Sequence, residues 1–169
     1  MNRLGKRIEL VANVCIIVLA LVISVALAKR FLLKSPGPAH VVSGIEIGTK
    51  INLPDVDWAK NDKTLVLVLS TGCKFCSASA SFYQNLVAKS AYSSGTKLIA
   101  VFPQSVEQAT EYLRSINVAI EDVKQASPAS LGARATPTLI LVNNFGLVTG
   151  SWVGQLSADK EVEVLARLQ

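Results

Sequence analysis

Residues 64–76, TLVLVLSTGCKFC, carry the strongest structural signal in the sequence. The first part, residues 64–70, is an apolar run of strand length, typical of a strand that is buried on both faces of a sheet. Gly72 ends this run, and from Cys73 to about Lys89 the apolar residues recur with helical spacing, which predicts an amphipathic helix. The stretch therefore joins a buried strand to a helix, with a Cys-x-x-Cys pair at the junction.

The position of Cys73 and Cys76 suggests a chemical role for both. A cysteine at a helix N-terminus faces unpaired backbone N–H groups and the positive end of the helix dipole, which favour thiolate over thiol. Cys76 follows one helical turn later, near enough to close a disulfide. Cys73 is therefore expected to attack a foreign disulfide, and Cys76 to resolve the resulting mixed disulfide.

Three other interpretations of this pair are open. A zinc site needs about four ligands, and beyond the two sulfurs the soluble region offers only His40. A purely structural disulfide around so short a loop would add little stability through loop entropy. Two ordinary core cysteines would need no function. The third cysteine, Cys15, lies in an apolar segment and is interpreted as an ordinary residue of a membrane helix without a chemical role.

A second motif, Ala135-Thr136-Pro137-Thr138, stands immediately before a predicted strand. Proline has no backbone donor and restricts the local geometry. Alone, the motif fits a simple turn before a strand. Together with the Cys-x-x-Cys pair it becomes a candidate part of the same site.

The rest of the soluble sequence predicts an α/β domain. Residues 97–102 form a second buried strand, closed by Pro103. The other predicted elements are a helix at 105–116 with Ser105 as its N-cap, a short strand at 118–123, a helical turn at 127–133, strands at 138–142 and 147–153 joined by a loop with Gly146, and a helix at 158–168. This order predicts a mixed central sheet with helices on both faces.

Together these residues resemble the thioredoxin fold, and more narrowly the membrane-tethered, extracytoplasmic TlpA/ResA-type thiol-disulfide oxidoreductases and related redoxin domains. The resemblance covers about residues 45–169, and residues 47–56 are similar to the short N-terminal strand of that group. It implies that Pro137 is cis and packs against the disulfide, and that Thr136 offers its backbone to a bound client chain. The implied partners are protein thiols or disulfides and a membrane electron donor or acceptor, with no metal or organic cofactor.

The sequence departs from the family pattern around Cys73. Gly72 stands where the family usually has tryptophan, and Leu67 where thioredoxins carry a buried acid. Lys74 replaces the more usual Gly or Pro; its cation would favour the thiolate and make the disulfide more oxidising, although a solvated surface lysine is an equally simple interpretation. Phe75 is expected either to contact a client peptide or to pack within the helix.

The net charge of +5 lies in the first part of the chain. Residues 1–34 carry six basic side chains and one acid, whereas residues 35–169 carry eleven of each. A neutral body lacks the broad positive field of a nucleic-acid-binding protein. No nucleic-acid partner is therefore expected.

The excess charge flanks an uncharged apolar run of 19 residues at 10–28. At about 1.5 Å per residue, such a helix spans the ~30 Å hydrocarbon core of a bilayer. A signal peptide cleaved after Ala28 is the alternative, although the run is longer than usual for one. The predicted organisation is a short N-terminal segment (1–9), a transmembrane anchor or signal peptide (10–28), a tether (29–44) and a thioredoxin-like domain (45–169).

The basic flanks of this run do not orient it, because they are equal at both ends. A reactive dithiol on an N-terminal tether favours a location outside the cytoplasm. The chain is therefore predicted to be a single-pass protein of the bacterial cytoplasmic membrane, with its soluble domain on the periplasmic side.

The leading functional hypothesis is thiol-disulfide exchange on extracytoplasmic proteins. A peroxiredoxin-like thiol peroxidase is disfavoured, because Val66 and Ser70 stand where that family has Pro and Thr before its reactive cysteine. A non-catalytic tethered binding or assembly module that uses the thioredoxin groove is the alternative from a different class. Reductases, oxidases and isomerases share the same site residues, so the sequence leaves the direction of exchange open.

Overall fold

The computed structural model describes residues 16–17, 19–20, 44–93 and 95–169. Residues 44 onward belong to one compact unit, and residues 16–17 and 19–20 are helical. No helix among the described residues is both long enough and apolar enough to cross a bilayer. Most of the predicted membrane segment (10–28) and of the tether (29–44) lies outside the described residues.

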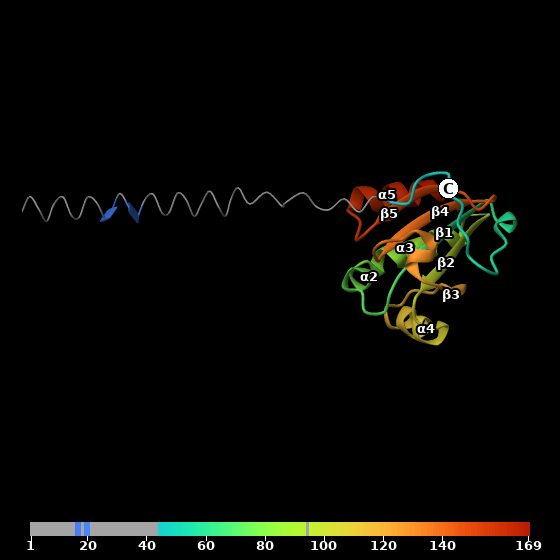
Figure 1. The fold of residues 1–169 in the computed structure, drawn as a ribbon, viewed down its shortest axis with the longest axis horizontal. Coiled ribbons are helices and arrows are strands. Elements are labelled where there is room, and N and C mark those ends of the chain that lie inside the picture. Colours follow the sequence, from blue (N-terminus) through green and yellow to red (C-terminus); the bar gives the residue numbers. More distant parts are fainter. Residues whose placement is uncertain (1–15, 18, 21–43, 94) are drawn as a thin grey trace, which may run out of the picture. The chain divides into compact units, whose positions relative to one another are not determined.

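A five-stranded mixed sheet in the order β3-β2-β1-β4-β5 forms the centre of the domain (Figure 1). Strands β1 (Lys63–Val68), β2 (Thr96–Phe102) and β3 (Val123–Gln125) run parallel to one another. Strand β4 (Thr138–Asn143) pairs antiparallel with β1 and with β5 (Val148–Val153). The predicted mixed sheet and its β4–β5 hairpin are confirmed.

The helices of the domain lie before the first strand, between the strands and after the last one. They are the α-helices α2 (Lys74–Ala78), α3 (Ala80–Ala91), α4 (Val106–Ser115) and α5 (Ala158–Arg167), and the 3₁₀ helices η1 (Trp58–Lys60) and η2 (Pro128–Leu131). As predicted, Ser105 caps α4, and its side chain accepts a hydrogen bond from the backbone N–H of Gln108.

The helix predicted from Cys73 to about Lys89 is two helices, α2 and α3, that meet at Ser79. The Ser79 hydroxyl donates to the carbonyl oxygen of Phe75 at 2.9 Å. Such side-chain bonds compete with the regular helical pattern. The apolar spacing continues through the break, which is why the sequence pattern alone does not reveal it.

Side chains of β1 alternate between two cores. Leu65 and Leu67 face a core formed with α3, α4 and α5, whereas Val66 and Val68 face a second core formed with the segment around residues 45–58 and with η2. The α-helices thus pack on one face of the sheet. Helices were predicted on both faces of the sheet, but among the described residues the only helices on the second face are the short 3₁₀ helices.

Two predicted strands differ from the structure. The strand expected at 118–123 pairs only from Val123 onward, because the alternating Val118 and Ile120 are buried against the helix-side core without joining the sheet. The N-terminal strand implied for residues 47–56 is reduced to one bridge, between Lys50 and Leu147. In the first segment the alternation reflects burial and not strand pairing. In the second, backbone hydrogen bonds join Gly48, Thr49 and Ile51 to residues 146–148 without forming a continuous strand.

Tyr83 of α3 is fully buried, and its hydroxyl has no hydrogen-bond partner among the described residues. Ser79 lies beside it but donates its own hydroxyl hydrogen to Phe75. Burial raises the pKa of Tyr83 far above its ordinary value of 10.0. The phenol is therefore held in its neutral form.

Replacing Tyr83 by phenylalanine is expected to change the free energy of unfolding at neutral pH by no more than about 1 kcal/mol, because no hydrogen bond is lost. Above the ordinary tyrosine pKa the unfolded chain loses this proton and the folded chain keeps it, so wild-type stability falls as the pH rises. The variant should lack this part of the alkaline loss. Urea unfolding at neutral pH and at about pH 11 measures the difference; equal alkaline losses in both proteins would contradict it.

Candidate active site

Cys73 and Cys76 form a disulfide at the start of α2, with their Cα atoms 5.2 Å apart. Cys73 is the N-cap of the helix and is partly exposed, whereas Cys76 is completely buried. An incoming sulfur can therefore reach Cys73 but not Cys76. The two cysteines thus differ in access in the way that the predicted attacking and resolving roles require.

The start of α2 supplies a hydrogen-bond donor to the exposed sulfur. The backbone N–H of Cys76 donates to Cys73 Sγ at 3.1 Å. A donor in this position stabilises negative charge on sulfur when the disulfide is reduced. The strand-to-helix junction in the sequence thus provides an electrostatic contact to Cys73.

The Thr136–Pro137 motif lies against the same sulfur. The carbonyl oxygen of Thr136 is 3.3 Å from Cys73 Sγ, and the peptide bond between Thr136 and Pro137 is cis. The carbonyl oxygen of Pro137 accepts a hydrogen bond from Gly154 N–H at 2.7 Å, and Thr138 Oγ1 donates to the Ala135 carbonyl oxygen at 2.7 Å. The loop before β4 is therefore held on both sides of the proline.

Lys74 and Phe75, the two residues between the cysteines, both point to solvent. Phe75 is 57% exposed, and Lys74 is exposed and forms no ion pair within the described part of the chain. The structure thus favours a surface role for Phe75 over packing within the helix. Both side chains are available to a client that reaches Cys73.

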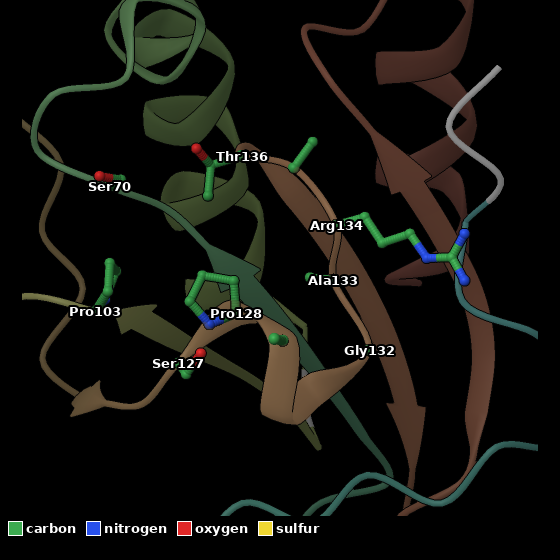
Figure 2. A pocket seen from close by; sticks show the side chains of 10 residues that line it. Ser70, Pro103, Ser127, Pro128, Gly132, Ala133, Arg134 and Thr136 are labelled. Carbon is green, nitrogen blue, oxygen red and sulfur yellow. The ribbon is translucent and has the colours of Figure 1, made fainter. Parts of the chain in front are cut away.

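A groove of about 840 Å³ is lined by Ser70 and Thr136, two residues that contact Cys73. Figure 2 shows the side chains that line this groove. Its lining consists mainly of small residues: Ser70, Pro103, Ser127, Pro128, Ala129 and residues 132–136. The side chain of Arg134 extends away from Ser70 and Pro103 (Figure 2). The groove meets the reactive pair at Thr136, whose carbonyl oxygen contacts Cys73 Sγ, and at Ser70, whose carbonyl oxygen accepts a hydrogen bond from Cys73 N–H at 3.1 Å.

Sequence patterns did not identify most of this groove. Pro103 comes from the loop after β2 and Pro128 from the start of η2, and only the fold brings them together. The available signal was weak: each proline stands next to a predicted strand or helical turn, where proline is common in any case. Ala135 and Thr136 are the groove residues that belong to a motif singled out from the sequence.

Two of the three departures from the family pattern, Gly72 and Leu67, change the surroundings of the disulfide. Gly72 is exposed, and no atom lies within 4 Å of the position that a Cβ would take there. Leu67 is fully buried in the same core as Cys76. Gly72 leaves the site open on one side. Leu67 places an alkyl group where the related fold carries an acid.

The zinc interpretation finds no ligand cluster in the described part of the chain. No group of three or more His, Cys, Asp or Glu side chains there is arranged to hold a metal ion. His40, the additional ligand considered from the sequence, lies outside the described residues.

No protein-family model and no curated protein matches this sequence. Solved structures do match. A protein assigned as thiol:disulfide interchange protein DsbE from Chlorobium tepidum has a TM-score of 0.58 at 23% identity, over 74% of this chain and 99% of that chain. A thiol-disulfide isomerase from Corynebacterium glutamicum has a TM-score of 0.54 at 14% identity, over 75% of this chain and 95% of that one.

A secreted Mycobacterium tuberculosis disulfide oxidoreductase, described as homologous to DsbE of E. coli, has a TM-score of 0.50 at 13% identity, over 63% of this chain and 80% of that one. At these identities the likeness establishes the fold. The described domain therefore has the thioredoxin fold, it carries a Cys-x-x-Cys disulfide, and its structural neighbours include thiol:disulfide interchange proteins.

Proposed function

We propose that this protein is a thiol-disulfide oxidoreductase that acts on disulfides or thiols of other proteins. The observation that carries the proposal is the difference in access within the Cys73–Cys76 disulfide, where one sulfur is exposed beside an N–H donor and the other is buried. A structural disulfide does not need this difference. An exchange reaction does, because the client must be bonded to one particular sulfur.

The reduced protein acts as a two-electron donor. The Cys73 thiolate attacks one sulfur of a client disulfide, so that a Cys73–client disulfide forms and the other client sulfur leaves as a thiolate. Cys76 then loses its proton and attacks Cys73 Sγ, which closes the Cys73–Cys76 disulfide and releases the second client sulfur. The client gains two electrons, and the protein reaches the oxidised form seen in the structure.

The reverse reaction uses the same atoms. A client thiolate attacks the exposed Cys73 Sγ of the oxidised protein and Cys76 leaves as a thiolate, after which a second client thiolate displaces Cys73. The reduction potential decides which direction dominates. A value near ~−270 mV would indicate a reductase and one near ~−120 mV an oxidase, and equilibration of the full-length protein with glutathione measures it.

The decisive experiment replaces Cys76 by serine in the full chain. This variant should form mixed disulfides with client proteins through Cys73 and should be unable to release them. The control is the double Cys73→Ser, Cys76→Ser variant, which should trap nothing. If the single variant also traps nothing while the double variant keeps its function in cells, the protein is a binding or assembly module and the proposed exchange reaction is wrong.

The groove beside Cys73 is the proposed binding site of the client chain. A client bonded to Cys73 would lie beside the groove, because Ser70 and Thr136 both line it and both contact Cys73. The lining of small side chains and the open space at Gly72 leave room for client side chains. Few contacts of the protein's own side chains would then hold the client.

Replacing Gly72 by tryptophan is expected to lower the KM for a peptide disulfide about fivefold, because an added aromatic contact is worth about 1 kcal/mol. Gly72 is exposed and has space around it, so the free energy of unfolding should change by less than about 0.5 kcal/mol. Steady-state kinetics and urea unfolding measure the two effects. The Gly72→Ala variant is the control and should behave as wild type; an unchanged KM in the tryptophan variant would place the client elsewhere.

The membrane anchor and the extracytoplasmic location are part of the same proposal. They are supported by the uncharged run at residues 10–28 with basic residues on both sides, and by the need of a disulfide-exchanging domain for a compartment that permits disulfides. The oxidised pair would be recycled there by a membrane electron donor or acceptor.

The location can be tested with a thiol reagent that does not cross membranes. In a Cys15→Ser background, mild reduction of intact cells should make Cys73 reactive from outside, since it is the exposed sulfur. The Cys73→Ser variant is the control for specific labelling. Protection of Cys73 in intact cells together with labelling after lysis would contradict the proposed orientation.

A further inference from the structure

Gln104 connects the loop after β2 to the turn that carries Cys73. Its side-chain Nε2 donates to Ser70 Oγ at 3.1 Å. Ser70 in turn accepts, through its backbone carbonyl oxygen, the N–H of Cys73 at 3.1 Å. The side chain of Gln104 is thus two hydrogen bonds away from the reactive cysteine.

The other end of this carboxamide is buried without a partner. Gln104 Oε1 is inaccessible to solvent and accepts no hydrogen bond from the described residues. A buried unpaired amide atom lowers stability, so a contribution to stability alone does not account for a glutamine here. Rotating the carboxamide by half a turn would exchange its two polar atoms and still leave one contact to Ser70 and one unpaired atom.

The turn that Gln104 holds places Cys73 Sγ between two groups of opposite effect. The N–H of Cys76, at 3.1 Å, stabilises a thiolate. The carbonyl oxygen of Thr136, at 3.3 Å, accepts a hydrogen bond from a thiol but repels a thiolate. The N–H belongs to the same helical turn as Cys73, whereas the carbonyl belongs to a separate loop. The contact between Cys73 Sγ and the Thr136 carbonyl oxygen therefore depends on the position in which the turn is held.

We infer that Gln104 is a positioning residue that holds the Ser70–Cys73 turn against the Thr136 carbonyl and thereby limits the ionisation of Cys73. The inference rests on the proposed exchange function. When the tie to Ser70 is removed, the thiolate can move away from the carbonyl oxygen, whereas the thiol gains nothing by moving. The thiolate fraction should rise, the reduced protein should become more stable relative to the disulfide, and the pair should become more oxidising.

The test replaces Gln104 by methionine, which keeps the length of the side chain and removes its hydrogen bonds. In a full-length Cys15→Ser background, the alkylation rate of Cys73 below its pH midpoint should rise about threefold to fivefold, the effect expected from one hydrogen bond. The equilibrium constant with glutathione should shift in the oxidising direction by a similar factor. The Ser70→Ala variant should show the same changes, and the double variant should add little to either single change.

Gln125→Ala is the matched control. Its side-chain amide donates to the Pro103 carbonyl oxygen in the same loop, at 3.4 Å, but has no hydrogen bond to the turn, so both readouts should stay at the wild-type values. An unchanged or raised pH midpoint in Gln104→Met, or additive effects of the Gln104 and Ser70 changes, would overturn the inference. Neither readout needs a client protein, so the result stands apart from the test of the proposed function.

Discussion

Replacing Cys73 by serine is expected to lower the rate of disulfide exchange by at least about a thousandfold, because a hydroxyl is ionised far less than a thiol near neutral pH and cannot replace it in a disulfide. Cys73 is the partly exposed sulfur, and among the described residues its contacts with Cys76 N–H and the Thr136 carbonyl have no counterpart at the buried Cys76. The fold should survive, since the pair closes a loop too short for much entropic stabilisation.

The measurement is reduction of a model protein disulfide by the full-length protein in the presence of a dithiol donor. Cys15→Ser should keep the wild-type rate, because the sequence places Cys15 far from the Cys-x-x-Cys pair. Cys76→Ser should complete only the first step and stop at the mixed disulfide. More than about 1% residual turnover in Cys73→Ser would mean that the exposed sulfur is not the nucleophile.

The strands of this fold could be predicted because the central strands are buried on both faces. Such strands appear in the sequence as continuous apolar runs, and residues 64–70 and 97–102 correspond to β1 and β2 with shifts of one or two residues. The 118–123 segment was placed less well, because the burial of alternate residues has the same pattern whether or not the backbone joins the sheet. The break at Ser79 depends on one side-chain hydrogen bond, which hydrophobic spacing does not encode.

The reactive pair could be predicted because its chemistry is local. Cys73 and Cys76 are three residues apart, and their position at a helix start follows from the strand that precedes them. Thr136 lies 63 residues further along the chain, and its contact with Cys73 was expected only through the resemblance to thioredoxin-like proteins. Gln104 offered no signal, since a glutamine after a strand is ordinary loop composition and its link to Ser70 exists only in the folded chain.

The missing buried acid raises the question of how Cys76 loses its proton during resolution. Leu67 is fully buried on β1, paired with Ala100 of β2 and Leu139 of β4. It belongs to the same core as Cys76. A carboxyl group at this position would be enclosed by apolar side chains.

Replacing Leu67 by aspartate is therefore expected to lower the free energy of unfolding by about 4 kcal/mol or more, from the lost apolar burial and the unpaired buried carboxyl group. Desolvation raises the pKa of a buried carboxyl group, so the folded variant would hold a proton that the unfolded chain has released. Its stability should then fall further as the pH rises from about 4 toward neutrality. Leu67→Asn creates a similar polar defect without a titrating group, and its destabilisation should not change over this range.

The same variant should release a client faster from the mixed disulfide, although it is less stable. Above the raised pKa of its carboxyl group, the folded variant carries a carboxylate in the core of Cys76, which can accept the proton of the resolving thiol. At such a pH a positioned base should accelerate this step at least about tenfold. Rapid mixing of a preformed Cys73 mixed disulfide measures the rate of client release, with Leu67→Asn as the reference of equal polarity. Equal release rates in the two variants would show that loss of the Cys76 proton does not limit resolution, and that Leu67 is in its place for the packing of β1 alone.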